Sequence, residues 1–523
     1  MRQEKSLRRV RLNEAWATFR QAMPPQIVKP SRFFTALEEK SMAKKAKKAK
    51  SKAKNRKQSE SSRKSKPASK TGASPVRSGR ATKRDPEMGA LRPTVRIYRQ
   101  GLGDCILVRL PRKDEPDFTL MIDCGVAVAT RNASEMMTNV VKNILDTVGT
   151  PAKVDVLAVT HEHWDHVSGF QQAADAFGRL GADEVWLAWT EDSKDQLAKK
   201  LKKDHAQAFA ALSRSAAVRA MSGDPAGGAD LLQMAGMLGA AGEKTKAALD
   251  IAKAKADPRY LKPTDMPIPV PGTGALIYVL GPPHDEKAIK NFKPSKRNPE
   301  VYELALDGSG ILGAGVFTAL AVGEDVRPFA DSYSISVESA QAIPFFQQSY
   351  WGTPGDASGW RRIEGDWLGG TDELALMLQA ATNNTSLVLA IELEDGDVLL
   401  FAGDAQVGNW LSWQDLTWTL PDGRVVTGPD LLARTVFYKV GHHGSHNATL
   451  RQQGLEQMKR LKTAVIPVDE VVAKKMRWGA MPLKGLIAVL DDKTGGRTFR
   501  TDIDAADGTP QLTADPLFFE FQI

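Results

Sequence analysis

The feature of this sequence that most constrains the fold is a group of potential metal ligands directly after a predicted buried strand. Residues 154–160 read Val-Asp-Val-Leu-Ala-Val-Thr, an apolar run typical of a strand. The six residues that follow are His161, Glu162, His163, Trp164, Asp165 and His166. In an extended segment alternate side chains point the same way, so His161 and His163 can hold one ion. Asp165 and His166 then turn into the next helix, where they can face a second ion. The pattern predicts an α/β protein with its site at a sheet edge.

The histidines of the chain fall into two clusters. Of the eight, three lie in 161–166 and three in 442–446, which leaves His205 and His284 elsewhere. Ordinary loop histidines are the alternative explanation for the first cluster, and four potential ligands in six residues argue against it. His205 lies in a segment rich in Lys and Ala, where a solvated helix face is expected. His284 follows a predicted strand and could reach a metal, although an exposed turn is the expected setting.

The His-x-His-x-Asp-His pattern resembles the signature of the metallo-β-lactamase superfamily, and other segments resemble that family in the expected order. Residues 118–123 resemble its early strand, which ends at Asp123, and residues 397–404 resemble the strand that ends at Asp404. The resemblance implies an αββα sandwich in which Asp123 braces the metal site without touching the metal and Asp404 bridges two metals. The implied metal ligands are His161, His163, Asp165, His166, Asp404, His442 and His443.

Three further motifs are similar to the branch that includes the hydrolase domain of competence DNA-uptake channel proteins. They are His442-His443-Gly-Ser445, Gly101-x-Gly103-Asp104 and Asn383-x-x-Ser386. The resemblance runs from about residue 94 to residue 501. Many metal-rich members have a further histidine between the first cluster and the Gly-Asp strand, and only His205 and His284 lie in that interval. Either one of His442 and His443 serves the first metal or that site is weak, so the number of metals stays open.

The resemblance implies metal-assisted hydrolysis by an activated water, with zinc as the cofactor, two ions as the expected number and manganese as an alternative metal. Asp165 could orient or deprotonate the water. Whichever of His442, His443 and His446 is not a metal ligand could donate a proton to the leaving group. Ser445 suggests a Ser-His nucleophile, but the segment lacks the Gly-x-Ser-x-Gly context of a nucleophile elbow.

Short apolar runs separated by turns predict a sheet-based domain. The expected strands are 94–99, 104–110, 118–123, 154–160, 184–189, 275–280, 386–393, 397–401, 435–440 and 463–468. Helical spacing of apolar residues predicts an amphipathic helix over 133–148. Two segments interrupt the strands: 193–256, which is expected to form two or three helices broken near Gly223, and 317–382, which is irregular and rich in aromatic residues. The second segment is expected to close with a helix over 372–381 and to cover a cleft.

The charge of the chain is divided unevenly. Residues 1–84 hold 26 Lys and Arg against five Glu, a net charge of +21, so the remainder carries −12. Residues 43–84 have almost no large apolar side chains and are expected to be disordered. This predicts a basic N-terminal extension over 1–90 and one domain over 91–523. The run 43–84 could bind nucleic acid or an anionic membrane surface, or it could be a solvated tail without a partner. Met42 is an alternative translation start.

The sequence has no secretory signal peptide and no apolar stretch long enough to span a membrane, which predicts a cytoplasmic location. Only two cysteines occur, Cys105 and Cys124, and they are expected to be buried apolar residues rather than a redox pair.

Three functions remain open at this point. The leading hypothesis is a phosphodiesterase or nuclease, because the resemblance and the basic extension both favour nucleic acid. The second is a hydrolase of small esters, lactones or thioesters, in which the aromatic segment 345–367 walls an apolar pocket. The third is a binding module without catalysis, for which the absent middle histidine is the best support.

Overall fold

The structure is a computed structural model that describes residues 92–221, 243–291, 339, 342–350, 378–476 and 478–523. The expected basic extension, the break near Gly223 and most of the segment 317–382 lie outside the described residues, as does most of the aromatic segment 345–367. No helix within the described ranges is both long enough and apolar enough to cross a membrane.

The first sheet runs in the order β16-β17-β1-β2-β3-β4-β5-β6. Its strands are β1 (Thr94–Tyr98), β2 (Cys105–Leu110), β3 (Phe118–Cys124), β4 (Lys153–Val159), β5 (Gly181–Ala188), β6 (Pro258–Leu261), β16 (Leu512–Ala514) and β17 (Phe518–Gln522). Strands β3 to β6 are parallel neighbours, whereas β1 pairs antiparallel with both β2 and β17. Because β3 and β4 are parallel, the metal-site aspartate of β3 and the loop after β4 meet at one edge of the sheet.

The second sheet runs in the order β15-β14-β13-β10-β9-β8-β7. Its strands are β7 (Ile268–Pro269), β8 (Leu276–Gly281), β9 (Val388–Glu392), β10 (Val398–Phe401), β13 (Thr435–Lys439), β14 (Thr463–Ile466) and β15 (Thr498–Arg500). A separate hairpin joins β11 (Thr417–Thr419) to β12 (Val425–Thr427). Strands β10 and β13 are parallel, so the loops that follow them share an edge.

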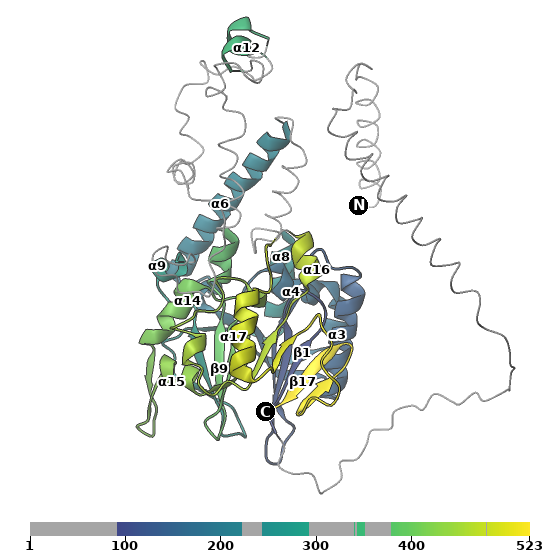
Figure 1. The fold of residues 1–523 in the computed structure, drawn as a ribbon, viewed down its shortest axis with the longest axis vertical. Helices are drawn as coiled ribbons and strands as arrows, with labels where there is room; N and C mark the ends of the chain where they lie inside the picture. Colours follow the sequence, from purple (N-terminus) through teal and green to yellow (C-terminus); the bar gives the residue numbers. More distant parts are fainter. Residues whose placement is uncertain (1–91, 222–242, 292–338, 340–341, 351–377, 477) are drawn as a thin grey trace, which may run out of the picture. The chain divides into compact units, whose positions relative to one another are not determined.

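Helices cover the outer faces of the two sheets (Figure 1). The helices are α3 (Ala133–Val148), α4 (Trp164–Gln172), α5 (Ala174–Phe177), α6 (Gln196–Met221), α8 (Glu243–Lys253), α9 (Glu286–Ile289), α12 (Pro344–Tyr350), α14 (Val407–Ser412), α15 (Gly428–Ala433), α16 (Glu470–Lys475) and α17 (Lys484–Thr494). Short 3-10 turns are η1 (Trp189–Glu191), η5 (Trp413–Asp415), η6 (Gly441–Gly444) and η7 (Leu455–Gln457).

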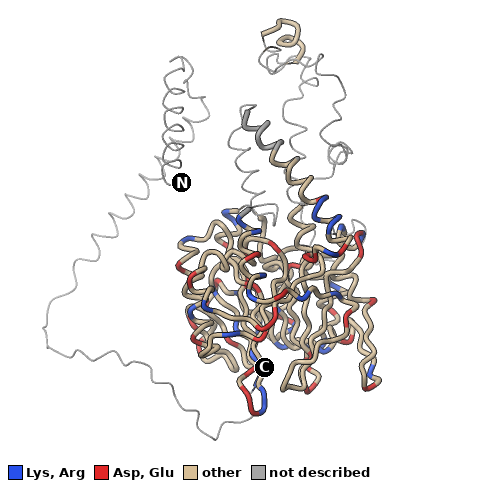
Figure 2. The backbone as a smooth tube through the Cα atoms, turned by 180° about the vertical axis from the view of Figure 1, so that it is seen from behind, with Lys and Arg blue, Asp and Glu red and all other residues tan. Residues whose placement is uncertain are grey.

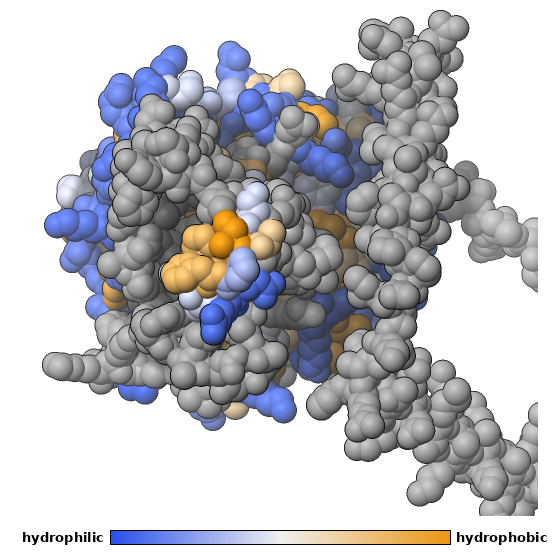
Figure 3. All heavy atoms as spheres, turned by 90° about the horizontal axis from the view of Figure 1, so that it is seen from above, coloured by the Kyte–Doolittle hydropathy of each residue, from blue (hydrophilic) through white to orange (hydrophobic). Residues whose placement is uncertain are grey.

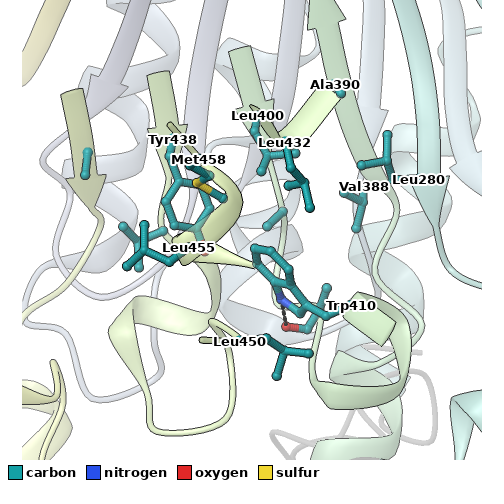
Figure 4. Close-up of a cluster of buried hydrophobic side chains, with 14 of the residues drawn as sticks. Leu280, Val388, Ala390, Leu400, Trp410, Leu432, Tyr438, Leu450, Leu455 and Met458 are labelled. Carbon is teal, nitrogen blue, oxygen red and sulfur yellow. Dashed lines mark hydrogen bonds between the residues drawn. The ribbon is translucent and has the colours of Figure 1, made fainter. Parts of the chain in front are cut away.

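Three buried apolar clusters separate the layers. On β3, alternate residues Leu120 and Ile122 pack between the sheets with Phe437 of the second sheet, whereas Met121 faces the cluster that holds α3 and α4. The third cluster lies between the second sheet and its helices. Figure 4 shows Leu280, Val388 and Leu400 from the strands around Trp410 of α14, whose indole nitrogen donates to the backbone carbonyl of Ala448 at 3.0 Å. The layers therefore run helix, sheet, sheet, helix, as expected for an αββα sandwich.

The expected elements correspond closely to the observed ones. Each of the ten predicted strands matches a strand of the structure, and α3 has both predicted bounds. Seven strands among the described residues were not predicted, because they are short or lie near a sheet edge with few β-branched residues: β6, β7, β11, β12, β15, β16 and β17. Cys105 and Cys124 are buried and unpaired by any disulfide, as expected.

The segment 193–256 contributes α6 and α8 between β5 and β6, two strands that pair in parallel. Helix α8 buries Ala248 and Leu249 in the cluster that includes α4, so it belongs to the outer layer of the first sheet. Acidic and basic residues are interspersed over the described backbone, and lysines gather at the start of α6 (Figure 2).

Of the segment 317–382, only α12, the residues beside it and a helical stretch from residue 378 are described, so the expected cover over a cleft lies largely outside the described residues. Phe345 of α12 is 64% exposed. Viewed from above, a small apolar group has a few hydrophilic residues directly beside it (Figure 3).

Candidate metal centre

The predicted site residues come together where strands of both sheets end. Asp123 lies at the end of β3, His161 follows β4, Asp404 follows β10 and His442 follows β13. Helix α4 begins at Trp164, so the chain turns from strand to helix inside the ligand segment. The parallel pairings of β3 with β4 and of β10 with β13 therefore bring residues far apart in sequence to one place.

One half of the site is rich in carboxylates. Asp165, His166, Asp404 and His443 each offer one ligand atom, and these atoms lie within 4.8 Å of one another. The Nε2 atom of His443 is 3.1 Å from Oδ2 of Asp165, and Nε2 of His166 is 3.2 Å from Oδ2 of Asp404. All four side chains are largely shielded from solvent. We call this group the carboxylate-rich half.

The other half consists of imidazoles. His161 Nε2 and His163 Nδ1 are 2.9 Å apart. His161 Nε2 and His442 Nε2 each lie 4.0 Å from Oδ2 of Asp404. We call His161, His163 and His442 the histidine-rich half. His443 Nε2 lies at a similar distance, 3.9 Å, from the same oxygen, so Asp404 is common to both groups.

The Oδ2 atom of Asp404 is the centre of the arrangement. Four imidazole Nε2 atoms surround it at 4.0 Å or less, those of His166 (3.2 Å), His443 (3.9 Å), His161 (4.0 Å) and His442 (4.0 Å). Asp404 Oδ2 and His166 Nε2 are nevertheless buried without a hydrogen bond of good geometry. Leaving buried polar atoms unsatisfied costs free energy, and a divalent cation among these atoms would satisfy them. The donor set of imidazoles and carboxylates suits zinc or manganese.

Each of these four imidazoles also has a partner at its other ring nitrogen, Nδ1. The partner atoms of Nδ1 are Asp123 Oδ2 for His166 (2.8 Å), Pro467 O for His443 (2.6 Å), Ser445 Oγ for His442 (2.7 Å) and Ser386 Oγ for His161 (3.2 Å). Such contacts fix the ring orientation and direct Nε2 toward a metal. Asp123 is itself held, because the backbone N–H and the hydroxyl of Thr160 donate to its two carboxylate oxygens at 2.7 and 2.6 Å.

Backbone conformation allows the consecutive histidines to diverge. His442 and His443 have φ values of 39° and 53°, in the left-handed region that residues with a Cβ rarely adopt. Strain of this kind persists only where surrounding structure holds it, and it is typical of functional sites. The centroids of the two rings lie 6.0 Å apart, although the residues are consecutive.

Two glycines allow the neighbouring loops to reach Asp165. A Cβ atom on Gly103 would lie 2.6 Å from the backbone oxygen of Asp165, and one on Gly125 would lie 2.3 Å from its carbonyl carbon. The backbone N–H of Asp104 donates to the Asp165 carbonyl at 3.1 Å. The glycines after β1 and β3 are therefore required by close packing around the ligand segment.

The two halves differ in protonation. Burial lowers the pKa values of His163 and His442 to about 4 and that of His161 well below its usual range, so these rings are neutral near pH 7. Burial also acts on His166 and His443, but the Asp404 carboxylate outweighs it and raises both pKa values. For Asp404, burial is outweighed by the imidazoles of His166 and His443, which hold its pKa well below the usual range.

Sequence reasoning did not identify Lys439 as a site residue. Its side chain is 1% exposed, and its ammonium forms an ion pair with Asp104, donates to the carbonyl of Gly403 at 3.1 Å and lies 3.7 Å from Oδ1 of Asp404. Asn383, quoted only as part of a motif, is fully buried with Nδ2 3.0 Å from His442 Nε2. One sequence signal could have indicated that Lys439 is buried at the site: it is an isolated lysine in an apolar strand, just before two histidines.

The remaining histidines lie outside both halves. His446 is half-buried and close enough to His442 to influence its pKa. His284 is exposed, as expected, and contacts Asp195 at 2.9 Å. The prediction that His205 lies on a solvated helix face is wrong, because it packs with Nε2 3.3 Å from the Thr382 hydroxyl, and burial lowers its pKa to about 4.

Residues 98–200 match the family model of the metallo-beta-lactamase superfamily. The matched segment contains 161–166 and ends before Asp404 and the second histidine cluster. No curated protein matches the chain. Together with the helix, sheet, sheet, helix layering, the match establishes a mixed α/β fold of the metallo-β-lactamase type, whose clusters of histidine and aspartate can bind metal.

Proposed function

We propose that this protein is a metal-dependent hydrolase that cleaves phosphodiester bonds with an activated water. The observation that carries the proposal is the single buried oxygen of Asp404, which lacks a hydrogen bond and is surrounded by four imidazole nitrogens within 4.0 Å. A divalent cation among these atoms would pair a carboxylate oxygen that is otherwise buried without a hydrogen bond. The match of residues 98–200 to a superfamily of mainly hydrolytic metalloenzymes supports the same conclusion.

The proposed centre uses both halves of the site. Asp165, His166, His443 and Asp404 would hold one cation, and His161, His163 and His442 would hold a second beside Asp404. His442 then takes the place of the middle histidine that the spacing of the chain lacks. Zinc fits this set, and manganese is the alternative. A divalent cation in this place supplies Lewis acidity, which makes a water nucleophilic near neutral pH.

The residues of the chain have separate tasks in this proposal. Asp165, whose Oδ2 is 3.1 Å from His443 Nε2, orients the attacking water. His443 acts as a ligand rather than as an acid, because its Nδ1 is held by the carbonyl of Pro467. His446 is left to protonate the leaving group, since it is half-buried beside His442 and belongs to neither half.

Phosphodiesters are the substrate class that the charges favour. Two divalent cations and the ammonium of Lys439 in one buried centre suit an anionic substrate. The net charge of +21 over residues 1–84 would raise the local concentration of a polyanion around an otherwise acidic domain. Similarity to the hydrolase domain of competence DNA-uptake proteins, seen in the motifs around Gly103, Asn383 and His442, supports nucleic acid.

The test measures metal content by mass spectrometry and hydrolysis of bis(p-nitrophenyl) phosphate and DNA. Full-length wild type should carry about two equivalents of metal and cleave both substrates. His163→Ala and Asp404→Ala should lose activity by about a thousandfold or more, since a metal ion stabilises the transition state by several kcal/mol. His284→Ala, which removes an exposed histidine outside both halves, is the matched control and should retain activity.

Other outcomes would redirect the assignment. Two equivalents of metal with turnover of esters, lactones or thioesters but not of phosphodiesters would identify a small-molecule hydrolase. Bound metal without turnover of any of these substrates would identify a binding module. Absence of metal in the wild type would overturn the proposal.

A further inference from the structure

A buried lysine lies directly behind the metal centre. Lys439 is the last residue of β13, and its ammonium contacts three oxygens, those of Asp104, Gly403 and Asp404. A buried ammonium is costly to desolvate unless it is paired and hydrogen-bonded. The three oxygens provide that pairing. Lys439 is therefore an internal cation whose place is defined by acidic and carbonyl groups.

The ammonium also fills what would otherwise be a second cation site. Asp104, Asp123 and His166 form a group whose ligand atoms lie within 4.8 Å of one another. Both Asp123 oxygens already accept hydrogen bonds from Thr160, and one of them also contacts His166. One oxygen of Asp104 is paired with Lys439, so only its Oδ1 lacks a partner. A metal would find one free oxygen there, whereas Lys439 already neutralises the group.

Lys439 also determines which oxygen of Asp404 is left for metal. Oδ1 of Asp404 faces the Lys439 ammonium at 3.7 Å and accepts a hydrogen bond from the backbone N–H of His442 at 3.1 Å. Oδ2 is directed at the four imidazoles and has no hydrogen bond. An oxygen that accepts a hydrogen bond and faces an ammonium is the poorer metal ligand of the two, so Oδ2 is the favoured one.

We propose that Lys439 is a positioning residue, which ties the loop after β1 to Asp404 through Asp104 and restricts Asp404 to one metal-binding oxygen. This inference rests on the proposed metal centre. It explains why a lysine lies among three buried carboxylates, those of Asp104, Asp123 and Asp404. Partners of metal ligands that do not touch the metal typically change metal affinity by about 10–100-fold when they are removed.

The test compares variants loaded with Co(II), whose visible absorption reports coordination, and measures affinity by competition with a chelator. The main variant is the double substitution Asp104→Asn with Lys439→Met, which removes both charges and leaves the net charge of the site unchanged. It should bind Co(II) about 10–100-fold more weakly, with an altered visible spectrum, because Asp404 is released. Asp104→Asn alone weakens the tie to the loop after β1 but keeps the contact of Lys439 with Asp404, so it should lose less Co(II) affinity than the double variant and retain the wild-type spectrum. Lys153→Met, at a lysine that is 45% exposed, is the matched control.

Each outcome decides the inference. If the double variant binds Co(II) as the wild type does and with the same spectrum, Lys439 does not position Asp404 and the inference is wrong. The same holds if Asp104→Asn alone reproduces the full loss. Lys439→Gln provides the same spectroscopic readout if the double variant does not fold. A wild type that binds no Co(II) would instead overturn the proposed metal centre, and the inference with it.

Discussion

The carboxylate-rich half and the histidine-rich half of the centre share Asp404 but differ in charge and in support. In the first, nearby carboxylates raise the pKa values of His166 and His443, and Asp123 holds one ring through a charged contact. In the second, all three imidazoles have lowered pKa values, and serine hydroxyls hold His161 and His442. The carboxylate-rich half thus has the more negative electrostatic potential. This predicts that it binds its cation first and more tightly.

The largest expected effect is a difference in metal content and hydrolysis between variants of the two consecutive histidines. His443→Ala should remove the tighter cation and lower hydrolysis by about a thousandfold, because metal activation supplies several kcal/mol. His442→Ala should retain about one equivalent of metal, because the carboxylate-rich half is intact. Metal content by mass spectrometry with hydrolysis of bis(p-nitrophenyl) phosphate provides the measurement. Equal loss of metal in both variants would show that the halves are not separate.

The second expected effect concerns the hydrogen bonds that hold the histidine rings in place. Asp123→Asn should weaken the tighter metal by about 10–100-fold, because the carboxylate that holds Nδ1 of His166 becomes a neutral amide. Ser445→Ala should weaken the other metal by less, since hydrogen bonds to charged groups are about twice as strong as neutral ones. Chelator competition on both variants measures the difference. A larger loss in Ser445→Ala would reverse the proposed ranking of the halves.

The third effect is a difference in pH dependence. In the absence of metal, His166 and His443 have pKa values above the usual 6.5 and hold protons that a metal must displace. Affinity of the carboxylate-rich half should therefore rise with pH above 6.5, by about tenfold per pH unit for each proton displaced, and level off above the raised pKa values. His163 and His442, with pKa values of about 4, carry no proton in that range, so the other half should be insensitive to pH. Metal titrations from pH 6 to 9 provide the comparison, and identical slopes would contradict it.

The smallest expected effect is a gain in zinc affinity. Asn383 is fully buried, and its Nδ2 lies 3.0 Å from His442 Nε2. Asn383→His should add an imidazole beside the histidine-rich half and raise its zinc affinity by about tenfold, or about 1.4 kcal/mol. Asn383→Ala serves as the control and should give no gain. A weaker second metal in Asn383→His would indicate that the added ring is not aimed at the site.

Much of this arrangement could be predicted from the sequence, because the candidate metal ligands directly follow strands with strong apolar patterns. Residues 154–160 and 397–401 are unambiguous strands, and parallel pairing brings their ends together. The left-handed backbone angles at His442 and His443 could not be predicted, because residues with a Cβ rarely adopt them. Lys439 was missed because a lysine at the end of an apolar strand usually faces solvent, and only the packing of the loop after β1 shows that it is buried.

The pairing of β17 with β1 has a consequence for how the protein is made. Strand β1 starts at Thr94, and its partner comes more than four hundred residues later, at Phe518–Gln522. At about 5–20 residues per second on the ribosome, His443 emerges roughly 15–60 s after His161. For most of that interval Asp404, His442 and His443 have not yet been synthesised. Metal captured early would be held by an incomplete set of ligands, so correct loading belongs after translation, when both sheets are closed.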